Sequence, residues 1–241
     1  RSQRKCFCKI SRLLPFVFNS LFLWRIMNPT STNERKVIIT GIGGQGIVFL
    51  TRLFSQTALD LGLGVVVSET HGMSQRGGSV ISHLKINGSD APLIQRGSAD
   101  VMIAMDPGEA MQNLDFMRRG GTVFVNSAEG LHESLAPHLE RLDIRVLNHP
   151  ATATAVELGS PAAANIVLAG FVAAFFILGL PYENMIQTLK QISKKGSEKN
   201  LQAINAGFEA GQKINEEKLK HKGHEAHTGK EGNQVVSVSP S

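Results

Sequence analysis

The sequence contains only two cysteines in 241 residues, Cys6 and Cys8, and both precede residue 27. The remaining chain therefore has no internal disulfide, no thiolate-bound iron–sulfur cluster and no catalytic cysteine. An isolated Cys-x-Cys offers too few ligands for a metal, so we expect no metal to be bound by this chain.

Most of the chain also lacks an excess of basic charge. The whole sequence has 25 Lys and Arg against 20 Asp and Glu, a formal net charge of +5. Residues 1–26 hold six of the basic residues and none of the acidic ones, which leaves 19 basic and 20 acidic residues in the remainder. The basic balance therefore gives no argument for nucleic-acid binding by the folded part.

The first 26 residues combine basic side chains with an apolar run over 13–24, a pattern similar to a secretory signal. Pro15, Asn19 and Ser20 interrupt the run, no small-residue cleavage site follows, and the run is too short for a transmembrane helix. We expect Met27 to be the natural start and residues 1–26 to be an artefact of a misplaced start. On that basis we expect residues 1–35 to be an N-terminal extension and the protein to be cytoplasmic.

From residue 36 onward, strand patterns alternate with helix patterns. An alternating stretch over 79–86 predicts one strand, and residues 45–61 and 107–119 predict helices. The short apolar runs that predict buried strands are 37–40, 65–68, 101–105, 122–126 and 144–147. This order predicts an α/β fold with a doubly wound, mainly parallel, Rossmann-like sheet and a helical C-terminal part.

Residues 162–180 are almost wholly apolar and predict one helix, either buried or spanning a membrane. We favour burial because the segment is rich in Ala and Gly and lacks basic flanks. Amphipathic helices are predicted over 181–193 and 197–212, and the polar residues 213–241 predict a disordered tail. Residues 36–212 therefore form the predicted domain.

A glycine-rich segment follows the first predicted strand. Gly41, Gly43 and Gly46 give a G-x-G-x-x-G pattern, with Gly44 and Gln45 between them; we call residues 41–46 the glycine turn. Such a turn allows a pyrophosphate to approach the backbone, and the following helix offers free N–H groups at its positive end. The alternative is a sharp strand-to-helix turn that binds nothing.

Glu69 follows the second predicted strand. Its separation in sequence from the glycine turn is typical of the acidic residue that binds a ribose in dinucleotide folds. A stand-alone NAD(P)-dependent oxidoreductase is therefore one hypothesis. Two features weaken it: a glycine-rich polar loop follows Glu69, and the only tyrosine, Tyr182, leaves no Tyr-x-x-x-Lys pair.

Residues 68–83 read Ser-Glu-Thr-His-Gly-Met-Ser-Gln-Arg-Gly-Gly-Ser-Val-Ile-Ser-His. This segment closely resembles the gamma-type component of the 2-oxoacid:ferredoxin oxidoreductase family, and within it the beta subunits of the indolepyruvate-oxidising members. The resemblance covers about residues 36–211. It departs from the family pattern at Asp106, where the family's Glu-Pro-x-Glu-Ala element begins with Glu.

The resemblance implies an enzyme that oxidatively decarboxylates a 2-oxoacid, transfers the acyl group to coenzyme A and passes electrons to ferredoxin. Thiamine diphosphate and iron–sulfur clusters carry that chemistry in the family. This chain has no Gly-Asp-Gly thiamine motif, so we expect both cofactors in a larger alpha subunit. The resemblance favours an arylpyruvate such as indolepyruvate as the substrate, and branched-chain 2-oxoacids, pyruvate and 2-oxoglutarate are the alternatives. We expect no nucleic-acid or membrane partner.

The other candidate site residues come from residues 68–83, the segment that carries the resemblance. Arg76 has a planar donor fork that suits a phosphate or a substrate carboxylate, and Gly77 and Gly78 allow close approach to a ligand. His71 and Glu69 are the candidate catalytic residues, which would orient the substrate or the thiol that forms the thioester. Alternatively the chain is a purely structural subunit, in which Arg76 forms an interface salt bridge and the turn only packs against the partner.

Overall fold

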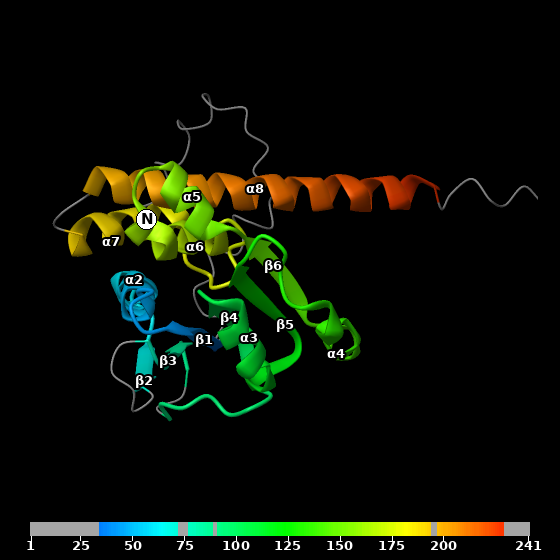
Figure 1. Ribbon diagram of the computed structural model, residues 1–241, viewed down its shortest axis with the longest axis horizontal. Coiled ribbons are helices and arrows are strands. Elements are labelled where there is room, and N and C mark those ends of the chain that lie inside the picture. Colours follow the sequence, from blue (N-terminus) through cyan, green and yellow to red (C-terminus); the bar gives the residue numbers. More distant parts are fainter. Residues whose placement is uncertain (1–33, 72–76, 89–90, 194–196, 229–241) are drawn as a thin grey trace, which may run out of the picture. The chain divides into compact units, whose positions relative to one another are not determined.

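Within the residues that the structure describes, six strands form one sheet in the order β2-β3-β1-β4-β5-β6, as seen in the computed structural model (Figure 1). Helices cover both faces of this sheet. The strands are β1 (Arg35–Ile42), β2 (Val65–His71), β3 (Ser79–Ile86), β4 (Ala99–Ala104), β5 (Met117–Asn126) and β6 (Arg145–His149).

The structure describes residues 34–71, 77–88, 91–193 and 197–228. The helices in this part of the chain are α2 (Ile47–Asp60), α3 (Pro107–Gln112), α4 (Ala136–Arg141), α5 (Ala151–Glu157), α6 (Ala164–Ala173), α7 (Tyr182–Ile192) and α8 (Ser197–Thr228).

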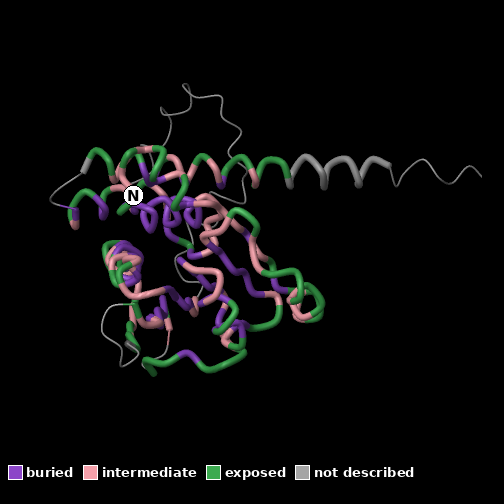
Figure 2. Tube along the Cα trace, in the orientation of Figure 1, coloured by how far each residue is buried: buried purple, intermediate pink, exposed green. Residues whose placement is uncertain are grey.

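Two apolar clusters hold the helices to the sheet, one on each face. The larger cluster joins the sheet to α2 and to the C-terminal helices α5, α6, α7 and α8. The smaller cluster joins the other face to α3 and α4. Figure 2 shows that the central strands and α6 are the most deeply buried parts of the described chain. The predicted α/β architecture with a helical C-terminal part is therefore confirmed.

One strand runs against the others. β3 pairs antiparallel with both β1 and β2, whereas β1, β4, β5 and β6 pair in parallel with one another, in that order. The sheet is thus mainly parallel, as predicted, but β3 lies between the first two strands of the sequence. This differs from a dinucleotide-binding fold, in which the first two strands are neighbours.

The helix predicted over 107–119 is wrong in its second half. α3 ends at Gln112, a single turn of 3-10 helix follows over Leu114–Phe116, and Met117 already begins β5. Gly120, at φ +73°, lies inside this strand, where the pairing with β4 shifts register. The glycines that resemble a helix end therefore belong to an irregular strand.

The apolar helix predicted over 162–180 is also shorter than expected. α6 stops at Ala173, and Phe176 and Gly179 adopt left-handed conformations in the turn that follows. All ten residues of α6 are buried. None of the helices in the described part of the chain is both long and apolar enough to cross a bilayer.

The last helix is longer than predicted. α8 continues past Gln212, its predicted end, to Thr228. Residues 229–241 of the predicted tail, and residues 1–33 of the N-terminal extension, lie outside the described residues.

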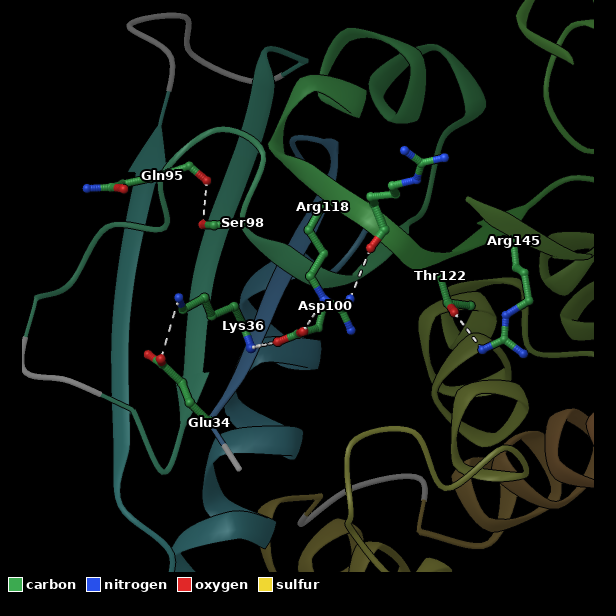
Figure 3. Close-up of polar contacts among 9 residues, drawn as sticks. Glu34, Lys36, Gln95, Ser98, Asp100, Arg118, Thr122 and Arg145 are labelled. Atoms are coloured by element: carbon green, nitrogen blue, oxygen red, sulfur yellow. Dashed lines mark hydrogen bonds and ion pairs between the residues drawn. The ribbon is translucent and has the colours of Figure 1, made fainter. Parts of the chain in front are cut away.

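The amino ends of the parallel strands are joined by polar contacts between neighbouring strands (Figure 3). Asp100 of β4 accepts one hydrogen bond from the Lys36 backbone N–H of β1 at 2.8 Å and another from Arg118 Nε of β5 at 2.6 Å. Arg145 of β6 donates to Thr122 Oγ1 of β5 at 3.2 Å. Asp100, Arg118 and Arg145 are therefore paired within the chain at this edge, whereas the glycine turn lies at the opposite edge of the sheet.

Candidate functional site

The carboxyl edge of the sheet brings most of the predicted site together. The glycine turn follows β1 and lies directly before α2. Because β3 is antiparallel, its first residues lie at the same edge, and Gly41 and His71 both pair with Val80. Arg76 and the side chain of His71 lie outside the part that the structure describes.

The glycine turn is held by hydrogen bonds within the chain. Gln45 Oε1 accepts from the Ile42 N–H at 2.7 Å, and the Gln45 N–H donates to the Ile42 carbonyl at 3.0 Å. The Gly43 N–H donates to the Gly78 carbonyl at 2.8 Å. Gln45 and Gly43 thus fix the shape of the turn. Because their backbone N–H groups are bonded within the chain, these two N–H groups are not free to bind a ligand.

Packing explains why two of the turn's positions must be glycine. A Cβ on Gly41 would lie 2.7 Å from Ile47 Cδ1 and 3.0 Å from Met105 Cβ. A Cβ on Gly46 would overlap the amide of Asn165. These two glycines therefore serve close packing, which is what a turn without a ligand would also require.

Gly44 differs from its neighbours in the turn. It is exposed, its φ is +101°, and a Cβ placed on it would meet no atom of the described chain within 4 Å. This backbone conformation favours glycine, whereas the packing around Gly44 would accept a larger residue. Gly44 is therefore the position at which something outside this chain can approach the backbone.

The amino end of α2 offers free donors beside Gly44. Gly46 occupies the capping position with φ +82°, so no side chain caps the helix, and residues 47–50 include no acid. Among the described residues, neither the Gly44 nor the Gly46 N–H has an acceptor. Free N–H groups and the positive end of a helix dipole favour an anion at this place.

Helix α3 holds the neighbouring strands through buried polar contacts. Glu109 is only 7% exposed and accepts a hydrogen bond at 2.5 Å from the Oγ of Ser79, the residue that follows Gly78. Asn113 Nδ2 donates to Thr40 Oγ1 at 3.1 Å, one residue before the glycine turn. The sequence marks Glu109 only as part of a family element, and no local pattern indicates its contact with Ser79.

Asp106 at the carboxyl end of β4 caps α3. Its Oδ1 accepts from the N–H groups of Gly108 at 2.8 Å and Glu109 at 3.1 Å. This carboxylate stabilises the start of a helix, as the sequence Asp106-Pro107 indicates.

Glu69 lies at the same edge but not beside the turn. It belongs to β2 and is exposed, and β3 separates its strand from β1. With about 4.8 Å between neighbouring strands, two strand spacings place the β2 backbone about 10 Å from that of β1. The acidic residue of a dinucleotide fold sits on the strand next to the turn, so the structure removes the main support for the NAD(P) hypothesis.

Two histidines in the described region have structural surroundings. Burial, with a smaller contribution from the charge of Lys85, lowers the pKa of His83, and its Nδ1 accepts from the Ile94 N–H at 3.2 Å. Burial also lowers the pKa of His149, whose ring stacks on Phe171 at 5.1 Å between centroids. Both rings are therefore neutral near pH 7, and His83 acts as a hydrogen-bond acceptor inside the fold.

Comparison with known proteins gives one family and one fold. Residues 36–210 match the family described as pyruvate ferredoxin/flavodoxin oxidoreductase. The chain is 32% identical over 186 residues to the indolepyruvate oxidoreductase subunit IorB of Archaeoglobus fulgidus, which covers 71% of this chain and 92% of that protein.

Two solved structures have a similar fold, each at 22% identity. The gamma subunit of keto/oxoacid ferredoxin oxidoreductase from Geobacter sulfurreducens aligns with a TM-score of 0.60, over 73% of this chain and 98% of its own. The 2-oxoglutarate:ferredoxin oxidoreductase from Magnetococcus marinus, with 2-oxoglutarate, coenzyme A and succinyl-CoA bound, aligns with a TM-score of 0.62, over 74% of this chain and 31% of its own.

Proposed function

Because the chain belongs to the pyruvate ferredoxin/flavodoxin oxidoreductase family, we propose that it is the subunit of a 2-oxoacid:ferredoxin oxidoreductase that holds coenzyme A. The complete enzyme would remove CO₂ from a 2-oxoacid, transfer the acyl group to the thiol of coenzyme A and pass two electrons to ferredoxin. Its larger alpha subunit would bind thiamine diphosphate and the iron–sulfur clusters.

The residues present support the proposed division of cofactors between the subunits. Iron–sulfur clusters need thiolate ligands, and no cysteine follows Cys8. The chain also lacks the Gly-Asp-Gly sequence of thiamine sites. Its own groups therefore fit neither cofactor, and its contribution to catalysis would be to bind and position a substrate.

The observation that carries the coenzyme A proposal is the free amino end of α2 next to Gly44. Coenzyme A contains a pyrophosphate and a further phosphate, and such anions bind well where unpaired backbone N–H groups meet a helix dipole. The Magnetococcus marinus enzyme, which is similar in fold over 74% of this chain, was solved with coenzyme A bound. In our proposal the Gly44 and Gly46 N–H groups and the first turn of α2 receive a phosphate of coenzyme A.

The loop between β2 and β3 would complete this site. Arg76 would pair with a phosphate of coenzyme A or with the 2-oxoacid carboxylate, since a guanidinium binds either anion through two parallel hydrogen bonds. Gly77, at φ +103°, and Gly78, which contacts Gly43, would keep the backbone of this loop close to the turn. His71 and Glu69 of β2, which lies beyond β3 at the same edge of the sheet, would orient the substrate or the thiol.

For the 2-oxoacid we propose an arylpyruvate such as indolepyruvate. The support is the resemblance of residues 68–83 and the 32% identity to an indolepyruvate oxidoreductase subunit. A purely structural subunit remains the competing function. It differs from our proposal in predicting that the glycine turn has no effect on the kinetics of coenzyme A.

Reconstitution of the enzyme from its separated subunits tests the proposed function. The chain is expected to copurify with a brown, thiamine-containing protein, and indolepyruvate-dependent reduction of ferredoxin should require both subunits and coenzyme A. Neither subunit alone should turn over. A colourless chain without a partner that binds NAD(H) instead would contradict the proposal and favour a free dehydrogenase.

A further inference from the structure

One polar side chain of the C-terminal helices reaches the glycine turn. Asn165 lies in the first turn of α6, is only 6% exposed, and is surrounded by apolar residues of that helix. Its Nδ2 donates to the Gly46 carbonyl at 3.3 Å, and its Oδ1 accepts from the Ile166 N–H at 2.9 Å. Asn165 therefore connects α6 directly to the start of α2.

The fold does not need this contact to satisfy the backbone. The Gly46 carbonyl already accepts the helical hydrogen bond from the Leu50 N–H at 3.0 Å. A buried amide is tolerated where both of its ends are hydrogen-bonded, as they are here. The oxygen of Asn165 serves the first turn of α6, whereas its nitrogen is directed at the glycine turn, and only this second contact lacks a role in satisfying the backbone.

Peptide geometry gives this second contact a role. The peptide between Gly46 and Ile47 is planar and trans, so its carbonyl and its N–H point in opposite directions. Holding the Gly46 carbonyl from inside the fold fixes the Ile47 N–H so that it points outward from the helix, where no intrahelical acceptor exists. A hydrogen bond to the carbonyl also polarises the amide and strengthens its N–H as a donor.

We propose that Asn165 is a positioning residue, which aims the Ile47 N–H at a phosphate of coenzyme A. The inference rests on the proposed function and extends it to the inner side of the turn. Asn165 itself does not touch the ligand in this account. It acts through one peptide group, so its effect is confined to ligands that carry the phosphate.

The test compares coenzyme A with pantetheine, which carries the same thiol but no phosphate, in the assembled enzyme. For Asn165→Leu we expect the ratio of kcat/KM for coenzyme A to that for pantetheine to fall about tenfold, the loss of about one charge-assisted hydrogen bond. Turnover with pantetheine and the KM for the 2-oxoacid should stay within about twofold. Asn165→Ala removes the same donor with a smaller side chain and should give the same ratio if the leucine variant fails to assemble.

A purely structural role for Asn165 would reduce the rates with both thiols equally and leave their ratio unchanged, which would overturn the proposal. Gly44→Asp, measured in parallel, separates the positioning role of Asn165 from the binding of coenzyme A at the glycine turn. If Gly44→Asp lowers the ratio and the Asn165 variants do not, the positioning role is wrong and the proposed function stands. If none of the variants changes the ratio, both are wrong.

Discussion

Replacing Gly44 by Asp is expected to raise the KM for coenzyme A at least tenfold in the assembled enzyme and to leave the KM for the 2-oxoacid nearly unchanged. The new carboxylate would stand beside the free N–H groups of α2, where it would repel a phosphate and compete for the same donors. One lost hydrogen bond to a charged group corresponds to about 1.5–3 kcal/mol, which is tenfold or more in affinity. Steady-state kinetics with each substrate varied in turn measures the effect.

The other end of the same helix supplies a matched control. Gly62 is exposed, has φ +75°, and would also meet no atom within 4 Å of an added Cβ. Gly62→Asp therefore introduces the same charge and a similar backbone strain, but far from the glycine turn. Equal KM values for coenzyme A in the two variants would mean that strain or overall charge, and not ligand binding, causes any change at Gly44.

Replacing Gly207 by Ala is expected to destabilise the fold by about 3 kcal/mol, near the upper end for overpacked cores. A Cβ on Gly207 of α8 would overlap the Val167 carbonyl oxygen of α6 and lie 2.9 Å from the Phe171 nitrogen. Gly170 of α6 meets the backbone of Ile204 on α8 in the same way. The two helices thus pack with their backbones in contact, and an added methyl group would force them apart.

The sign of this effect distinguishes packing from helix propensity. Alanine in the middle of a helix is about 1 kcal/mol more favourable than glycine, so propensity alone predicts that Gly207→Ala stabilises α8. Gly64→Ala is the control, because a Cβ there meets nothing within 4 Å and its φ is not positive. Denaturant titration of the purified chain gives both values. A Gly207→Ala variant as stable as the wild type would show that the helices do not pack this closely.

Much of the fold could be predicted because the pattern is local. The apolar run before Gly41 and the alternating stretch over 79–86 each identify a strand within about two residues of the observed ends. The direction of β3 was not predictable in this way, since alternation reveals which residues share a face but not which strand lies alongside. Because β3 lies between β2 and β1, Glu69 is separated from the glycine turn, and the arrangement differs from a dinucleotide site.

Helix ends were harder to predict where apolar residues continue past the end. The segment after Ala173 is as apolar as α6 itself, so composition gives no stop signal before Gly179. Phe176 takes a left-handed conformation in the turn that follows, and a phenylalanine gives no signal of such a conformation in the sequence. Conversely, Gly170 and Gly207 resemble interruptions of a helix but serve the contact between α6 and α8.

The family was correctly predicted from residues 68–83, whereas the inner part of the candidate site was not. The contact between Asn165 and Gly46 joins residues 119 positions apart, and that between Ser79 and Glu109 joins residues 30 positions apart. Such contacts depend on how the helices dock onto the sheet. In the sequence Asn165 is only a polar exception within an apolar segment. Its contact with Gly46 could be identified only from the packing of α6 against the start of α2.

Photo-crosslinking tests most directly whether coenzyme A lies at the glycine turn. Coenzyme A with an azide on its adenine would be irradiated with the assembled enzyme, followed by trypsin digestion and mass spectrometry. Residues 37–52 form one tryptic peptide that contains the whole turn and the start of α2. We predict an adduct on this peptide that excess unlabelled coenzyme A abolishes. Competable adducts confined to the larger subunit would contradict the proposed role of this chain.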